Sequence, residues 1–180
     1  VLPTSDPVAL STVFFDDPAI RKLSFTGSTE VGVKLAAQSA KTMKRVSLEL
    51  GGHAPFLIFA DADVDRAVAE VAASKFRNAG QTCVCANRIY VHERVHDAFV
   101  EKFSTLVSAL RVGDPLDEAT QVGPLVDRPG QDKVRAHVDD AVARGARAVV
   151  GGGVGEGLHF EPTVLTGVAR GMRILEEETF

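Results

Sequence analysis

The sequence predicts an α/β fold built on a largely parallel sheet. Along much of the chain, short apolar runs alternate with stretches whose apolar side chains recur at helical spacing. Glycines end the early apolar runs, and Ser or Asp stands where several of the helical stretches begin. This alternation is typical of βαβ units, in which helices connect parallel strands. We therefore expect a layered α/β protein, and we find no internal repeat.

The first part of the chain is expected to form two strands around one helix. Residues 22–26 and 45–50 are the predicted strands. Between them, Ser28 is expected to cap a helix that runs to about residue 42, because a Ser side chain can accept a hydrogen bond from a free amide of the first turn. One side of this helix is expected to carry Val31, Leu35 and Met43.

A pair of glycines, Gly51 and Gly52, follows the second of these strands. Two adjacent glycines let the backbone leave one sheet and enter another. We therefore expect a domain boundary here, with residues 1–50 on one side and residues 51–180 on the other.

The second part is expected to hold four strands and three helices. The predicted strands are residues 55–60, 88–92, 146–150 and 162–165. Asp61 or Asp63 is expected to cap a helix that places Val64, Val68, Val71 and Phe76 at core spacing. A further helix carries Val95, Phe99, Phe103, Leu106 and Leu110 in steps of three or four, and another runs from about 131 to 144. Residues 78–86 are polar and turn-prone, and residues 113–129 form a long loop.

The composition argues against several functional classes. The net charge is −4, the basic residues never form a run, and Trp is absent, so a nucleic-acid partner is not expected. The apolar runs are much shorter than the roughly 20 residues that span a bilayer. The two cysteines cannot form a secreted disulfide framework, and they indicate a reducing compartment, by default the cytoplasm. The five histidines show no metal-ligand spacing, so no metal is expected.

Two residues are candidates for chemistry on local grounds. Cys83 lies in the polar stretch and could act as a thiolate nucleophile if a base or its neighbours ionise it, although an isolated Cys more often packs as a small apolar side chain. Glu49 lies between two leucines on an apolar strand. A carboxylate there either pairs with a cation, is held by backbone amides, or sits in a dry site with a raised pKa, as a general base requires.

Four segments together resemble the aldehyde dehydrogenase superfamily over essentially the whole chain. They are Phe25-Thr26-Gly27-Ser28-Thr29, Leu48-Glu49-Leu50-Gly51-Gly52, Gly80-Gln81-Thr82-Cys83 and Glu177-Glu178-Thr179-Phe180. The stretch from Lys75 to Arg88 is similar to the succinate-semialdehyde dehydrogenase branch. The resemblance implies the end of a Rossmann-like cofactor domain in residues 1–50, followed by most of an α/β catalytic domain in residues 51–180.

The resemblance also implies a reaction and its residues. Cys83 would form a thiohemiacetal that gives hydride to NAD or NADP, and Glu49 would activate the water that hydrolyses the resulting thioester. The implied cofactor-binding residues are Gly27, Ser28, Val31, Leu50, Gly51 and Glu178. Ser28 would contact the pyrophosphate, for which a helix N-terminus offers free amides, and Glu178 would bind the nicotinamide ribose.

Two further residues mark the branch. Arg77, six residues before Cys83, would bind a substrate carboxylate with two parallel hydrogen bonds; alternatively it is a surface Arg at a helix end. Cys85 would form a short-loop disulfide with Cys83 as a redox switch, or it simply packs inside. The substrate would then be succinate semialdehyde or a similar aldehyde.

The chain resembles only the central part of such enzymes. It begins with Val1-Leu2-Pro3, and no segment matches the upstream Asn of the oxyanion site or the Lys that grips the adenosine ribose. We expect a stretch of a longer polypeptide that forms a homo-oligomer. The alternatives are an aldehyde dehydrogenase with another substrate class, and a catalytically silent piece that lacks the complete cofactor and oxyanion sites.

Overall fold

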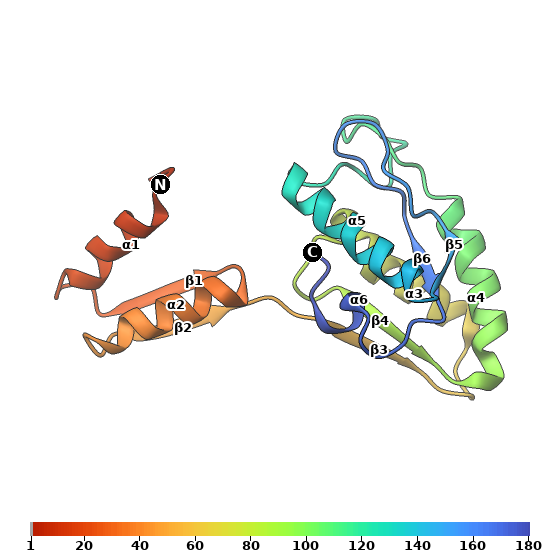
Figure 1. Cartoon of the computed structure of the whole chain (residues 1–180), viewed down its shortest axis with the longest axis horizontal. Coiled ribbons are helices and arrows are strands. Elements are labelled where there is room, and N and C mark those ends of the chain that lie inside the picture. The colour runs from red at the N-terminus through yellow and green to blue at the C-terminus, as the bar shows by residue number, and fades with distance from the viewer. Residues whose placement is uncertain (1) are drawn as a thin grey trace. The chain divides into compact units, whose positions relative to one another are not determined.

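The computed structural model describes residues 2–180, and its backbone divides into two compact units, Val1–Gly51 and Gly52–Phe180 (Figure 1). The division falls between the two adjacent glycines. The identity of the units as a cofactor domain and a catalytic domain stays a prediction. No helix among residues 2–180 is both long and apolar enough to cross a membrane.

The first unit is a βαβ arrangement preceded by a helix. Its elements are α1 (Pro7–Asp16), β1 (Lys22–Thr26), α2 (Thr29–Ala40) and β2 (Arg45–Glu49). β1 and β2 pair in parallel, with Lys22 opposite Arg45 and Thr26 opposite Glu49. Because the strands are parallel and in this register, both end at the same edge, next to the first turn of α2.

Two features of this unit differ from the expectation. Helix α1 was not predicted, although Asp6 accepts a hydrogen bond from Ala9 N and Pro7 occupies the first turn, both of which are helix-start signals. Met43 does not lie on the apolar side of α2. The helix ends at Ala40, and Met43 follows in a left-handed turn with 87% of its surface exposed.

The second unit holds the remaining elements. They are β3 (Ala54–Ile58), α3 (Val64–Phe76), the 3₁₀ turn η1 (Arg77–Gly80), β4 (Ala86–Val91), α4 (Glu93–Ser108), α5 (Arg128–Ala143), β5 (Arg147–Val150), β6 (Val164–Thr166) and α6 (Arg173–Glu176). β3 and β4 pair in parallel, as the alternating pattern predicts, whereas β5 and β6 pair antiparallel. The short elements η1 and α6 were not predicted, because four residues carry too little periodicity to reveal a helix.

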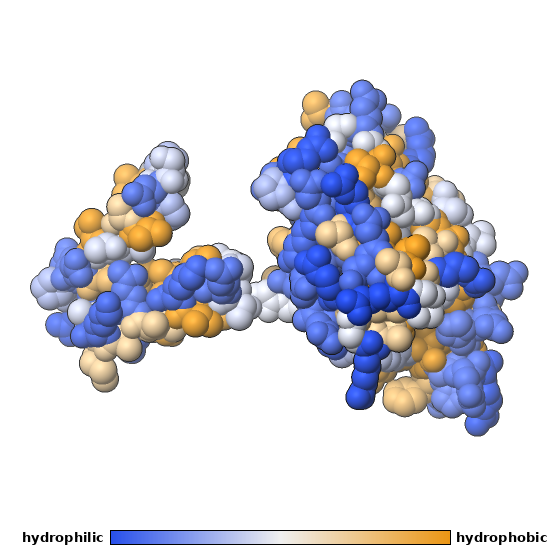
Figure 2. Space-filling view, in the orientation of Figure 1, coloured by the Kyte–Doolittle hydropathy of each residue, from blue (hydrophilic) through white to orange (hydrophobic). Residues whose placement is uncertain are grey.

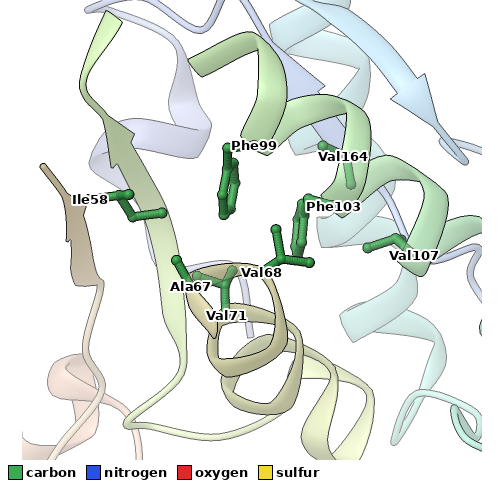
Figure 3. Packing of buried hydrophobic residues seen from close by; sticks show 8 residues of the cluster. All are labelled: Ile58, Ala67, Val68, Val71, Phe99, Phe103, Val107 and Val164. Carbon is green, nitrogen blue, oxygen red and sulfur yellow. The ribbon is translucent and has the colours of Figure 1, made fainter. Parts of the chain in front are cut away.

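The core of the second unit lies where α3 and α4 pack against strands (Figure 3). Its buried members are Ile58, Ala67, Val68, Val71, Phe99, Phe103, Val107 and Val164. The rings of Phe99 and Phe103, one turn apart on α4, stack with centroids 5.3 Å apart. The predicted core positions on both helices are thereby confirmed. Polar residues cover most of the face of this unit seen in Figure 2, with apolar residues scattered among them.

Candidate active site

In the first unit, three candidate residues meet at the carboxyl edge of β1 and β2. Gly27 N donates to the backbone oxygen of Glu49 at 3.0 Å, so the turn after β1 is fixed to the end of β2. Ser28 caps α2, and its Oγ accepts from Val31 N at 3.3 Å. Among the described residues, the N–H groups of Thr29 and Glu30 have no acceptor. The turn therefore presents free amides at a helix N-terminus, which suits a phosphate group.

Leu50 and Gly51 follow Glu49 in the chain, and the side chain of Leu50 packs against Gly32 of α2. Gly32 is buried on α2, and a Cβ at this position would lie 2.4 Å from Cδ2 of Leu50. Any larger residue at this position would push the end of the Leu50 side chain aside. Val31, by contrast, is exposed beside the Ser28 turn. The predicted cofactor residues of this unit therefore lie along one edge of the β1–β2 pair.

The environment of Glu49 differs from the expectation. Its side chain is exposed at the end of β2, and within residues 2–180 it has no ion-pair partner. The dry site and the cation pair that its leucine neighbours suggested are both absent from this part of the chain. The reason is that β2 is one of only two paired strands here, and its burial is slight: apart from the half-buried Leu48, its residues are exposed.

In the second unit, Cys83 is exposed on a loop whose backbone is held by polar contacts. Asn78 and Ala79 adopt left-handed conformations, with φ of 52° and 54°, which non-glycine residues seldom adopt. Asn78 Nδ2 donates to Gln81 O at 3.0 Å, and Gln81 Nε2 donates back to Asn78 O at 3.1 Å. Gln81 Oε1 also accepts from Val126 N at 2.8 Å, which fixes the loop to the start of α5. The loop thus holds an exposed thiol on a strained backbone.

Cys85 is buried with 1% of its surface exposed, and its thiol lies 3.5 Å from Lys75 O. Both cysteines are free thiols. Of the two alternatives for Cys85, the structure has the residue packed inside. Its role as a redox partner of Cys83 stays a prediction. No group of three His, Cys, Asp or Glu side chains among residues 2–180 could hold a metal ion.

Gly52 brings the Cys83 loop and Glu178 together. A Cβ at Gly52 would lie 2.9 Å from the backbone oxygen of Cys83, so the two backbones touch. Gly52 N also donates to Oε1 of Glu178 at 3.0 Å. The neighbouring backbone is held by Arg88, whose Nε and Nη2 donate to His53 O at 3.0 and 2.5 Å. The predicted nucleophile and the predicted ribose ligand therefore share one structural support.

Arg77 lies at the junction of α3 and η1, six residues before Cys83. Its side chain is exposed, and no carboxylate of the described residues lies within ion-pair distance of it. A guanidinium that is free of protein partners can bind an external anion through two parallel hydrogen bonds.

Comparison with known proteins decides the family. A family model described as the aldehyde dehydrogenase family matches residues 1–180. The chain belongs to the aldehyde dehydrogenase family. It is 51% identical, over 98% of its length, to the NADP+-dependent succinate-semialdehyde dehydrogenase of Escherichia coli. A glutarate-semialdehyde dehydrogenase of Pseudomonas putida is 53% identical over 89% of the chain, and a 3-sulfolactaldehyde dehydrogenase of the same species is 48% identical over 98%.

The α/β fold agrees with solved aldehyde dehydrogenase structures. The chain superimposes on the succinate-semialdehyde dehydrogenase of Burkholderia pseudomallei with a TM-score of 0.95 and 51% identity over 98% of its length, which is 37% of that structure. The curated relatives are likewise covered only in part: 37% of the E. coli enzyme, 34% of the glutarate-semialdehyde enzyme and 37% of the sulfolactaldehyde enzyme. The chain therefore spans about a third of the aldehyde dehydrogenases that it matches.

Three features of this aldehyde dehydrogenase chain were not predicted from its sequence. These are the contact of Gly52 with Cys83, the hydrogen bonds of Arg88 with His53, and the left-handed backbone at Asn78 and Ala79. The Gly51-Gly52 pair was a visible signal, but it was interpreted only as a domain boundary. Its second glycine also permits the close approach to the backbone of Cys83, the predicted nucleophile.

Replacing Gly52 by Ala is expected to disturb the Cys83 loop. The new Cβ would lie 2.9 Å from Cys83 O, so one of the two backbones must move. We expect kcat to fall by about 10²-fold, since misplacing a reacting group by about 1 Å has that effect. Steady-state kinetics of the full-length gene product would measure it. Gly157→Ala is a control for general destabilisation, because Ala is strained at its φ of 62° while the new Cβ would meet nothing within 4 Å. An equal loss in both variants would contradict the prediction.

Proposed function

We propose that the protein oxidises an aldehyde that carries an anionic group, succinate semialdehyde first among them, to its carboxylic acid with NAD+ or NADP+. The observation that carries this proposal is the exposed Cys83 thiol on a fixed loop that touches Gly52, whose amide also binds Glu178. Membership in the aldehyde dehydrogenase family supports the reaction class. The names of the similar relatives support the substrate class.

Cys83 acts as the nucleophile. Its thiolate attacks the aldehyde carbon, an S–C bond forms, and the carbonyl oxygen takes up a proton to give a thiohemiacetal. When bound, NAD+ or NADP+ would supply the hydride acceptor. The thiohemiacetal carbon then loses a hydride, its hydroxyl group loses a proton to solvent, and a thioester to Cys83 remains. Glu49 then takes a proton from a water molecule as that water attacks the thioester carbonyl. The C–S bond breaks, the acid leaves, and the Cys83 thiolate is restored.

The cofactor residues bind and orient rather than react. Free amides and the Ser28 hydroxyl at the start of α2 suit the pyrophosphate, with Gly27, Val31, Leu50 and Gly51 lining the approach. Glu178 uses Oε1 to accept from Gly52 N, and its carboxylate has no other hydrogen bond or ion pair within residues 2–180. Its second oxygen is therefore open to a ribose hydroxyl.

Arg77 selects the anionic group. Two of the relatives are named for semialdehydes of dicarboxylic acids, which carry a carboxylate, and a third is named for an aldehyde that carries a sulfonate. These substrates differ in length and in acid group but share a negative charge. An exposed Arg77 without a protein carboxylate suits all three, because a guanidinium binds either oxyanion through paired hydrogen bonds.

The substrate proposal is tested by replacing Arg77 with Gln. For succinate semialdehyde we expect kcat/KM to fall about 10- to 100-fold, since a hydrogen bond to a charged group contributes about 1.5–3 kcal/mol. For butanal, which has the same carbon chain without the carboxylate, kcat/KM should change less than twofold. Steady-state rates of NAD(P)H formation by the full-length gene product measure both.

Arg66→Gln is the matched control, because Arg66 is an exposed Arg near the start of α3, the helix that Arg77 follows. It should leave both substrates unaffected. Equal losses for succinate semialdehyde and butanal in the Arg77 variant would contradict a role in anion selection and would favour an aldehyde dehydrogenase of another substrate class. The homo-oligomer, the cytoplasmic location and the redox function of Cys85 stay predictions.

A further inference from the structure

His137 is a polar side chain of α5 that is completely buried, with 0% of its surface exposed. Both of its ring nitrogens have partners. Nδ1 lies 2.7 Å from Oγ1 of Thr179, and Nε2 lies 3.1 Å from Oε2 of Glu177. A buried histidine with both nitrogens hydrogen-bonded has a single ring orientation, so it also holds its two hydrogen-bond partners in place. The mechanism above does not use it.

The hydrogen-bond partners of the two ring nitrogens determine which nitrogen of His137 carries the proton. Burial, with the nearby charges of Arg173 and Lys133, lowers the pKa of His137 from its usual value despite the opposing Glu177 carboxylate, so the imidazole is neutral at neutral pH. Hydrogen bonds from Arg173 and then from His137 lower the pKa of Glu177 to about 2, so that carboxylate is ionised and can only accept. Nε2 therefore donates to Glu177, and Nδ1 accepts from the Thr179 hydroxyl.

Glu177 and Thr179 stand on either side of Glu178. The backbone at Glu177 is extended, with φ −109° and ψ 140°, and successive side chains of an extended segment point to opposite sides. Because residues 177 and 179 both turn toward His137, the side chain between them points away from α5. There, Oε1 of Glu178 accepts from Gly52 N. His137 thus holds the two neighbours of the proposed ribose ligand.

A second link to α5 supports this arrangement. Arg173 of α6 donates to both carboxylate oxygens of Glu177, at 2.8 and 2.9 Å. The backbone N of Arg173 donates to Oδ2 of Asp140, on α5, at 2.9 Å. The Glu177–Thr179 segment is therefore fixed to α5 at two places. Of the side chains that make these contacts, only His137 binds both residues that flank Glu178.

We propose that His137 is a positioning residue that orients Glu178 for the nicotinamide ribose by holding Glu177 and Thr179. The inference rests on the proposed function, because it takes Glu178 as the ribose ligand. His137 touches neither substrate nor cofactor, so its effect reaches the reaction through the Glu177–Thr179 segment.

His137→Leu in the full-length gene product removes both hydrogen bonds. We expect the Kd for NADP+ or NAD+ to rise about tenfold, as the loss of a charge-assisted hydrogen bond allows. The matched control is Gln131→Leu. Gln131 is 1% exposed on the same helix, and its Nε2 donates to Gly157 O and His159 O rather than to the Glu177–Thr179 segment. His137→Gln keeps an amide donor for Glu177 and should restore most of the affinity. Isothermal titration measures Kd, and thermal unfolding measures the stability of each variant.

The proposal is supported if His137→Leu weakens cofactor binding, His137→Gln restores it, and Gln131→Leu lowers the unfolding temperature without changing Kd. The rate of Cys83 alkylation without cofactor should be the same in all of them. If His137→Leu and Gln131→Leu weaken binding equally, or if His137→Leu binds like the unaltered protein, the inference is overturned and the proposed function stands. If the unaltered protein binds neither nucleotide, both are overturned.

Discussion

Replacing Cys83 by Ser is expected to lower kcat for aldehyde oxidation by roughly 10⁴-fold or more, the scale on which enzymes lose activity when the nucleophile is removed. A thiol is partly ionised at neutral pH, whereas a Ser hydroxyl requires a strong base beside it. No side chain among the described residues accepts a hydrogen bond from the Cys83 thiol. A Ser at this position would therefore have no activating partner among these residues. The rate of NAD(P)H formation by the full-length gene product measures the loss.

Cys85→Ala is the matched control for this prediction. Cys85 is two residues away and buried, so its loss should change stability rather than kcat. Iodoacetamide labelling adds a direct readout: Cys83 is exposed and should react quickly, and substrate with NAD(P)+ should slow the reaction. If Cys85→Ala abolished turnover while Cys83→Ser retained it, the nucleophile would have been assigned to the wrong cysteine.

The sequence predicted most of the elements because their periodicity is local. Phe99 and Phe103 recur at helical spacing, and both are buried as predicted. Asp63 caps α3, one of the two positions proposed for that helix start. By contrast, α1 was missed although Asp6-Pro7 is a helix-start signal, since no apolar stripe accompanied it.

Site residues could be proposed from the sequence only where the information that marks them is also local. The segment around Cys83 carries its own motif, and the structure has this thiol exposed, while its role as the nucleophile stays a prediction. The contact of Gly52 with Cys83, and the hydrogen bonds of His137 to Glu177 and Thr179, join residues tens of positions apart. Such contacts depend on how the elements pack, and neither composition nor spacing encodes them. For Glu49, burial was one of three environments that its apolar neighbours allowed, and the two-stranded β1–β2 pair leaves the residue exposed. Its role as the general base stays a prediction.

Replacing Glu49 by Gln is expected to slow turnover by about 10²- to 10⁴-fold, the contribution of a positioned general base. Gln has the same size but accepts no proton at neutral pH. Because the proposed role of Glu49 begins only after hydride transfer, the first turnover should survive. We therefore expect a burst of one NAD(P)H per active site, followed by a slow steady state.

Rapid-mixing measurement of NAD(P)H by the full-length gene product resolves the two phases. Hydroxylamine, which attacks thioesters without a base, should raise the slow phase of Glu49→Gln but not that of the unaltered protein. Glu30→Gln is the matched control, since Glu30 is an exposed carboxylate in the first turn of α2 that pairs with Lys34. A Glu49 variant without a burst would place its action before hydride transfer, in the activation of Cys83.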